Sequence, residues 1–246
     1  VLDLFAIVPD YDLDIMAPGQ DLFDVTSRAL LGLRDVVREE RPDVVLVHGD
    51  TTTSFVGALA AFYEGIPVGH VEAGLRTGDL SAPFPEEANR SLTGRITRYH
   101  FAPTERAQQN LRAENTPESH IWVTGNTVID ALLWVRDRVA ARRDWGDAFG
   151  AATPVVLGGD RIVLITGHRR ENHGQGFEDL CAGIADSARR HPSTHYIYPV
   201  HLNPKVQEPV NRLLGGLANV HLIDPLPYEP FVYLMNRAAV VLTDSG

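Results

Sequence analysis

Apolar and polar positions follow each other along this chain in a way that predicts strands and helices in regular alternation. Between residues 21 and 41, apolar side chains recur every three or four positions, as on the buried face of an amphipathic helix, and Pro42 would end that helix. Residues 44–47 are continuously apolar, which is typical of a parallel strand buried on both faces. A helix over 51–63 and a strand over 66–71 then complete a β-α-β unit, whose two strands run parallel.

The alternation continues through the rest of the chain. Further helices are expected at 85–97, 105–114, 128–143, 177–190, 206–214 and 230–237. Further strands are expected at 99–102, 120–123, 161–166, 196–200, 220–223 and 239–242. Residues 144–160 collect Gly, Pro and Asp without a clear period, so we expect a loop there. The pattern predicts the α/β class, with two Rossmann-like parallel-sheet halves formed by residues 1–125 and 126–246.

The two ends of the chain leave this pattern unfinished. Residues 1–7 resemble the tail of a helix, and residues 240–246 form a strand and a turn that should lead into another helix. A doubly wound sheet needs helices on both faces. We therefore expect a fold that is incomplete at both termini, without the first strand of one half and the last helices of the other.

Composition narrows the classes of partner. The chain carries 22 Lys and Arg against 32 Asp and Glu, a formal net charge of −10, which argues against a nucleic-acid partner. No apolar run approaches the ~20 residues that cross a bilayer, so we expect no membrane partner. Cys181 is the only cysteine, so a disulfide within the chain is excluded, the cytoplasm is the expected compartment, and a buried packing role is expected for this thiol.

Acidic side chains stand where neighbouring strands should end. Asp50 closes the run 43–50, Glu72 closes the run 66–72, and Glu86 follows a loop rich in Gly and Pro. Ligands of open α/β sheets bind at the carboxyl ends of the strands. Carboxylates that converge there indicate proton transfer.

Each of these acids also has a simpler interpretation. Asp50 could help a hydroxyl-rich stretch to cap the next helix, which is the more common role for such residues. Arg76 could pair with Glu72 at the surface. Glu86 and Glu87 could have no role beyond complementing the dipole of the helix that follows.

A basic turn follows the strand at 161–166. Residues 167–176 combine glycines, two arginines and histidines before a helix, a composition that suits a diphosphate, although a solvated basic loop is an equal alternative. Its glycine spacing matches neither a P-loop nor a dinucleotide fingerprint. Histidines at strand ends raise a metal site as an alternative, but no pair has the helical i, i+4 spacing of zinc proteases, and we predict no metal. These histidines are His48, His70, His168 and His201.

Read together, these segments resemble the non-hydrolysing UDP-N-acetylglucosamine 2-epimerase family. The segments are 48–53 (HGDTTT), 69–79 (GHVEAGLRTGD), 85–90 (PEEANR), 124–130 (TGNTVID), 166–172 (TGHRREN), 199–204 (PVHLNP) and 242–246 (LTDSG). The resemblance implies two halves that face a cleft, the GT-B arrangement. It also implies interconversion of UDP-N-acetylglucosamine and UDP-N-acetylmannosamine without a cofactor. In the family, UDP is eliminated to leave 2-acetamidoglucal and then adds back with C2 inverted.

The resemblance also assigns roles to residues of this chain. The residues implied in catalysis are Asp50, Glu72, Glu86 and His168. Those implied in substrate binding are Arg169, Phe231, Ser245 and Gly246. The positions at which some family members bind a second UDP-N-acetylglucosamine as an activator are Gln20, Glu86, Arg169 and His201. A homodimer is the implied assembly.

Three other functions stay open at this point. A hydrolysing 2-epimerase would release UDP and free N-acetylmannosamine, and product analysis distinguishes it. A GT-B glycosyltransferase would transfer the sugar without exchanging the C2 proton. A non-catalytic nucleotide-sugar sensor would bind the ligand and tolerate Asp50→Asn.

Overall fold

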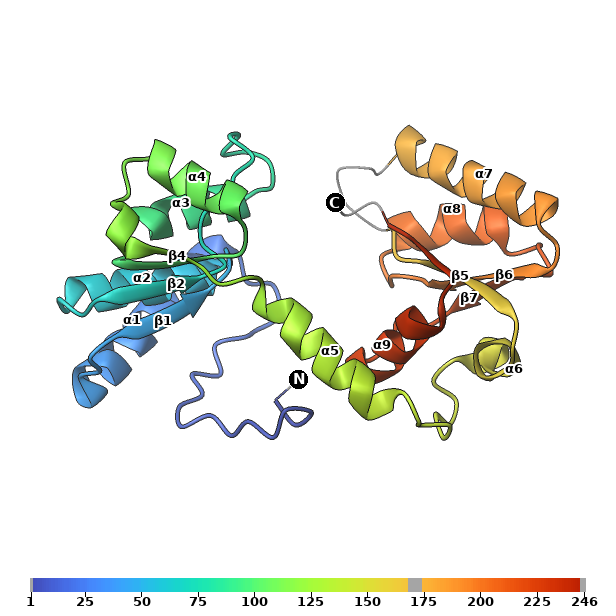
Figure 1. Cartoon of the computed structure of the whole chain (residues 1–246), viewed down its shortest axis with the longest axis horizontal. Helices are drawn as coiled ribbons and strands as arrows, with labels where there is room; N and C mark the ends of the chain where they lie inside the picture. Colours follow the sequence, from blue (N-terminus) through green and yellow to red (C-terminus); the bar gives the residue numbers. More distant parts are fainter. Residues whose placement is uncertain (1, 168–173, 244–246) are drawn as a thin grey trace. The chain divides into compact units, whose positions relative to one another are not determined.

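The chain folds into two compact units, Val1–Asp130 and Ala131–Gly246 (Figure 1). The structure, a computed structural model, describes residues 2–167 and 174–243. Helix α5 (Thr127–Val139) contains the point at which the two units divide. The expected domain boundary between residues 125 and 126 stays a prediction.

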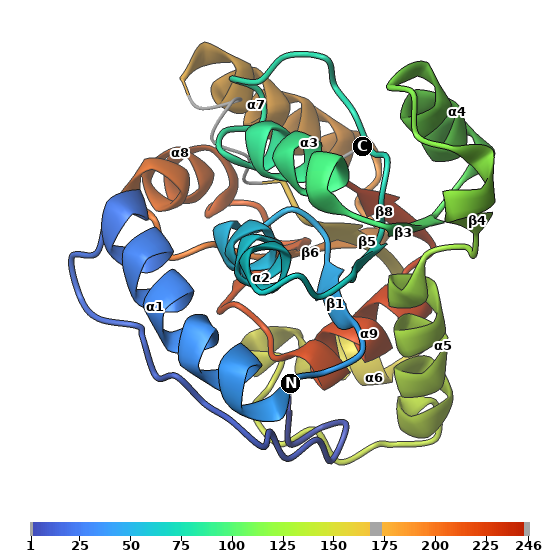
Figure 2. The same ribbon diagram turned by 90° about the vertical axis from the view of Figure 1, so that its left-hand side faces the viewer.

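The N-terminal unit is built on a four-stranded parallel sheet in the order β1-β2-β3-β4. Its strands are β1 (Val45–His48), β2 (Val68–Val71), β3 (Tyr99–Ala102) and β4 (Ile121–Val123). Its helices are α1 (Leu22–Glu40), α2 (Thr52–Tyr63), α3 (Glu86–Ile96), α4 (Glu105–Ala113) and the short 3-10 helix η1 (Glu118–His120). Helix α2 packs between α1 and α3 (Figure 2). The strand order confirms the parallel crossovers expected from the sequence.

Local signals set the ends of helices α1 and α2. Asp21 caps α1 through a capping box with Asp24, and Arg41 ends the helix in the left-handed conformation, one residue before Pro42. Helix α2 begins after Thr51, whose hydroxyl accepts a hydrogen bond from the Ser54 N–H. The hydroxyl-rich stretch therefore caps this helix, as the simpler interpretation expected, but through Thr51 and without Asp50 among the described cap contacts.

The C-terminal unit has a second four-stranded parallel sheet in the order β7-β6-β5-β8. Its strands are β5 (Arg161–Ile165), β6 (Thr194–Pro199), β7 (Val220–Ile223) and β8 (Val240–Leu242). Its helices are α6 (Thr153–Leu157), α7 (Gln175–Arg190), α8 (Pro204–Leu214) and α9 (Tyr228–Arg237), with the 3-10 helix η2 (Gly150–Ala152). Strands β6 and β8 lie on opposite sides of β5, so the strand order reverses there, and such a switch point is where ligands bind.

One expectation about this unit was wrong. Residues 144–160 are not a plain loop, because they contain η2 and α6, and α5 ends at Val139 rather than near residue 143. Phe149 and Val156 are fully buried in this stretch. A helix of five residues makes less than two turns, which is too short to show a helical period in the sequence. No helix in the described part of the chain is long and apolar enough to span a membrane.

Candidate functional site

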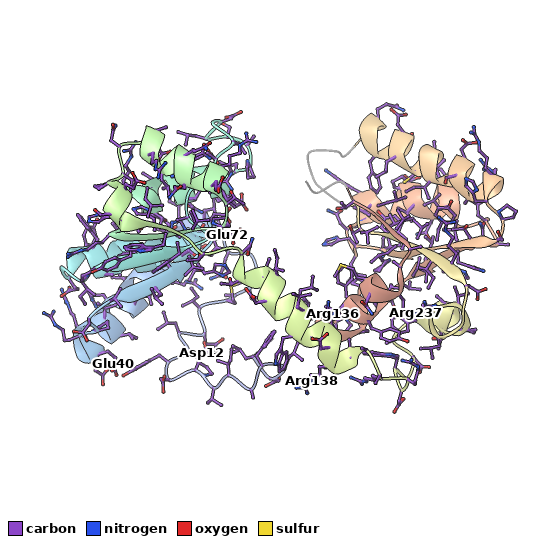
Figure 3. The ribbon with its side chains drawn as sticks, viewed as in Figure 1. Asp12, Glu40, Glu72, Arg136, Arg138 and Arg237 are labelled. Carbon is purple, nitrogen blue, oxygen red and sulfur yellow. The ribbon has the colours of Figure 1, made fainter. Side chains whose placement is uncertain are left out.

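Asp50 and Glu72 emerge at the same edge of the N-terminal sheet. Strands β1 and β2 pair in parallel register, with His48 opposite Val71. Asp50 stands two residues after the end of β1, and Glu72 stands directly after the end of β2, where Figure 3 labels it. Both side chains are half-buried. The structure thus places the two acids as the sequence predicted.

Helix α3 holds Asp50 from two sides. The Arg90 guanidinium donates to the Asp50 carboxylate, with Nη1 and Oδ2 3.1 Å apart. The Asn89 amide donates to the Asp50 backbone carbonyl, with Nδ2 and O 3.0 Å apart. Arg90 and Asn89 are both buried, so water does not compete strongly for these bonds.

Arg90 is shared with a second carboxylate, that of Glu87. Its Nε lies 2.6 Å from Glu87 Oε2, and Glu87 is only 1% exposed. Glu87 also accepts hydrogen bonds from the backbone N–H groups of Thr77 and Gly78, at 3.1 and 3.0 Å. Burial opposes ionisation of Glu87, but these hydrogen bonds and the guanidinium outweigh it and lower its pKa. Glu87 therefore anchors a loop, and complementing a helix dipole is not its main role.

Glu86 lies on the helix face that meets Asp50. Residues three and four apart share a helix face, so Glu86 stands one turn before Asn89 and Arg90 on that face. Glu86 is half-buried, and its carboxylate forms no hydrogen bond or ion pair with another residue that the structure describes. Its carboxylate is thus available for a ligand. Pro85 is the N-cap residue of α3 rather than its first helical residue.

Glu72 has a strained backbone and a histidine partner. Its φ is +68°, in the left-handed region that residues other than glycine rarely adopt, and such strain concentrates at functional sites. His48 Nε2 lies 3.2 Å from Glu72 Oε2, with 57% of the histidine and 28% of the glutamate side chain exposed. Arg76 instead forms a two-bond pair with Glu114, at 2.7 and 3.0 Å, so the alternative that Arg76 pairs with Glu72 is wrong.

A separate pocket lies in the C-terminal unit, at the carboxyl ends of its strands. It has a volume of about 200 Å³ and brings together Phe231 and His201, two residues of the predicted site. The pocket is lined by Ile165, Thr166, Pro199, His201, Pro225, Leu226 and Phe231. Mainly apolar walls with a few polar groups are typical of small-molecule sites.

Four predicted site residues lie outside the described residues, namely His168, Arg169, Ser245 and Gly246. Their described neighbours in the chain follow β5 and β8, two strands that pair directly. The Thr166 N–H donates to the Leu242 carbonyl at 2.9 Å. The strands that lead into the two predicted binding turns therefore lie side by side.

Gln20, a predicted activator contact, is engaged in a local turn. Its Oε1 accepts from the Ala17 N–H at 2.8 Å, and its Nε2 donates to the Ile15 carbonyl at 2.5 Å. Both ends of the amide thus already have partners in the segment that precedes α1. In the described part of the chain, no group of three or more His, Cys, Asp or Glu side chains could hold a metal ion.

Sequence reasoning missed the residues that hold the acids in place. Asn89, Arg90 and Glu87 all fall within the segment 85–90 that carried the family resemblance, but no role was predicted for the first two. Their helical spacing could have indicated that Glu86, Asn89 and Arg90 share one face. Which partner that face meets depends on the packing of α3 against α2 and β2.

Comparisons with known proteins agree on one family. The family model for UDP-N-acetylglucosamine 2-epimerase matches residues 1–246. The UDP-N-acetylglucosamine 2-epimerase of Escherichia coli (strain K12) is 59% identical over 246 residues, which are 100% of this chain and 65% of that protein. The enzyme of that name from Neisseria meningitidis serogroup A is 48% identical over 249 residues, with 66% of its length covered. The chain spans about 65% of the length of the curated relatives that it matches.

Solved structures give the same result. The crystal structure of UDP-GlcNAc 2-epimerase from Neisseria meningitidis bound to UDP-GlcNAc matches with a TM-score of 0.90 at 48% identity, over 100% of this chain and 66% of that one. The Methanocaldococcus jannaschii UDP-GlcNAc 2-epimerase in complex with UDP-GlcNAc and UDP matches with a TM-score of 0.77 at 31% identity, again over 100% and 66%.

Proposed function

This chain belongs to the UDP-N-acetylglucosamine 2-epimerase family, and on that basis we propose that it carries the acids that interconvert UDP-N-acetylglucosamine and UDP-N-acetylmannosamine. The observation that supports this most is the placement of Asp50 and Glu72 at one sheet edge, with Glu86 one turn before Arg90 on the helix that holds Asp50. Inversion at C2 needs a base on one face of the sugar and an acid on the other, so at least two proton carriers must converge.

The proposed reaction conserves the substrate's atoms. A carboxylate takes the C2 proton while the C1–O bond breaks and its electron pair leaves with UDP, which gives 2-acetamidoglucal. A proton then returns to C2 from the opposite face, while a phosphate oxygen of UDP forms the C1–O bond again. Asp50 and either Glu72 or Glu86 share the proton transfers. No redox cofactor takes part, since no net electron transfer occurs.

The nucleotide is assigned to the C-terminal unit. Phe231 stacks on the uracil in the pocket of about 200 Å³, where an aromatic ring suits a planar base. His168 and Arg169 hold the diphosphate and so stabilise the charge that grows on the leaving group. Ser245 and Gly246 contact the phosphate and ribose. The homodimer, the cytoplasmic location and the activator site follow from the family resemblance alone and stay predictions.

The test follows C2 exchange in deuterated water. The 246-residue chain is joined to the flanking segments of the Escherichia coli relative, and the product sugar is analysed by mass spectrometry and NMR. We expect UDP-N-acetylmannosamine that carries deuterium at C2. Product without deuterium contradicts C2 proton abstraction, and release of UDP with free N-acetylmannosamine indicates a hydrolysing enzyme.

The variant Asp50→Asn separates an enzyme from a sensor. We expect the exchange rate to fall by about 10²–10⁴ with UDP affinity unchanged, the range typical for loss of a general acid or base. Asp43→Asn is the control, because Asp43 is exposed and precedes β1 at its opposite end. An Asp50→Asn protein with full activity contradicts the assigned role.

A further inference from the structure

A buried histidine on β2 contacts the turn that carries Asp50. His70 is fully buried, and its Nε2 lies 2.7 Å from the backbone carbonyl oxygen of Gly49. Gly49 adopts a φ of +69°, and its N–H donates to the Val71 carbonyl at 3.0 Å. Strand β2 therefore holds Gly49 at both its N–H and its carbonyl group, directly before Asp50.

The contacts fix the proton on one ring nitrogen of His70. A carbonyl oxygen can only accept, so Nε2 must carry the hydrogen. Nδ1 is buried without a hydrogen-bond partner among the described residues. Burial, the main cause, lowers the pKa of His70, although the bond to Gly49 and the charge of Asp50 oppose this, and Arg76 and His48 lower it further. His70 is thus a neutral ring in one tautomer.

We propose that His70 is a positioning residue for the reaction, which fixes the Gly49 carbonyl and thereby the direction in which the Asp50 carboxylate enters the site. The inference rests on the proposed function of Asp50 as a proton carrier. His70 itself transfers no proton, because its single N–H is bound to a backbone oxygen. A misplacement of about 1 Å in a catalytic group can lower a rate 10²-fold, so a backbone clamp at this position has a large effect.

A second histidine distinguishes this role from simple packing in the core. His100 is the register partner of His70 on β3, is equally buried, and also has an Nδ1 without a partner among the described residues. Burial lowers the pKa of His100 to about 4. Its ring bonds to the Thr97 backbone instead of the Gly49 turn. The two rings therefore share burial and charge state and differ in what they hold.

Four variants test the proposal in the full-length fusion described above. In His70→Gln the amide nitrogen takes the place of Nε2, whereas in His70→Asn it takes the place of Nδ1 and cannot reach Gly49. We expect kcat to fall about 100-fold in His70→Asn with KM changed less than threefold, and to recover to within about tenfold of the parent in His70→Gln. His100→Asn and His100→Gln should keep kcat within threefold.

A second measurement detects the hydrogen bond between His70 and the Gly49 carbonyl independently of enzyme activity. The carbonyl ¹³C NMR shift of Gly49 moves when its hydrogen bond is lost, so it should change in His70→Asn, return towards the parent value in His70→Gln, and stay constant in both His100 variants. Equal kcat losses in His70→Asn and His100→Asn, or an unchanged Gly49 signal in His70→Asn, overturn the proposal. If the parent fusion shows no C2 exchange, the proposed function fails, and the Gly49 signal alone decides whether His70 holds the turn.

Discussion

Arg90 donates to the carboxylate of Asp50, 40 positions earlier in the sequence, with Nη1 and Oδ2 3.1 Å apart. The same guanidinium forms an ion pair with the buried Glu87. One cation therefore serves both a proposed proton carrier and the carboxylate that anchors the loop at Thr77 and Gly78. Its removal should affect both stability and catalysis.

Arg90→Met should lower the free energy of unfolding by about 3 kcal/mol, because it leaves Glu87 buried without its counter-charge. Urea titration measures this loss. The double variant Arg90→Met with Glu87→Gln should recover part of it, since the Gln side chain carries no charge and its amide oxygen still accepts from one of the two loop N–H groups. Arg34→Met is the control, because Arg34 pairs with Asp35 at the exposed surface, where solvent screens the pair, and its loss should leave the free energy of unfolding nearly unchanged. Equal losses for Arg90→Met and Arg34→Met would contradict the buried-pair argument.

Low pH should destabilise the folded chain, partly through protonation of His100. Its pKa is about 4 in the folded chain and near ~6.5 when unfolded, so the unfolded chain takes up the proton first as the pH falls. The stability tied to this group is fully present above pH ~6.5 and is lost towards pH ~4, with a total of about 3 kcal/mol.

The comparison of the parent chain with His100→Gln isolates this effect. Urea titrations at pH 7.5, 6 and 5 should show that the parent loses more stability than the variant over this range. The variant has no group that titrates at this position. The free energy of unfolding of the parent, relative to that of the variant, should therefore decrease as the pH falls. A difference that stays constant from pH 7.5 to 5 would show that His100 does not stay neutral in the fold.

Two glycines with the same backbone conformation should respond differently to alanine. Gly74 has a φ of +89°, and a Cβ there would lie 2.3 Å from the Ala107 carbonyl oxygen. Gly78 has a φ of +85°, but a Cβ there would meet no atom within 4 Å. Gly78→Ala should therefore cost only the left-handed penalty of about 1–2 kcal/mol, and Gly74→Ala clearly more, above about 3 kcal/mol. Thermal unfolding of the two variants measures the contrast, and similar losses would refute the close approach of the 74–75 turn to α4.

Phe231→Ala should weaken UDP binding about tenfold, since stacking of a base on an aromatic ring is typically worth about 1–3 kcal/mol. Isothermal titration calorimetry on the full-length fusion gives the affinity. Phe62→Ala is the matched control, because Phe62 is an exposed phenylalanine on α2 in the other unit and should leave UDP affinity unchanged. An unchanged UDP affinity in Phe231→Ala would contradict the proposed contact between Phe231 and the uracil.

Local sequence signals predicted the helices and strands better than the contacts between side chains of different helices and strands. The strands at 99–102 and 220–223 were predicted at the bounds that the structure shows, because turn-forming residues flank short, mostly apolar segments there. Helix α6 was missed, because five residues show no period. The edge position of Asp50 and Glu72 followed from parallel pairing alone.

The partners of the charged residues could not be predicted in the same way. Arg76 pairs with Glu114, 38 positions away, rather than with nearby Glu72. Glu86 and Glu87 are neighbours in sequence, but only Glu87 turns into the interior and meets Arg90. Both outcomes depend on how α3 and α4 pack beside the sheet, which periodicity does not specify.

The bridge formed by Glu87 constrains any attempt to redesign this family. Since the Glu87 carboxylate binds both the backbone N–H groups of residues 77–78 and the arginine beside Asp50, a substitution that moves the backbone of that turn should also displace the arginine that holds this proposed proton carrier. Variant libraries that aim to change the proposed sugar specificity should therefore vary residues 77, 78 and 90 together while keeping an acid at 87. Single substitutions at these positions would mostly lose stability or function and be eliminated, even where the combined substitutions are compatible with the fold.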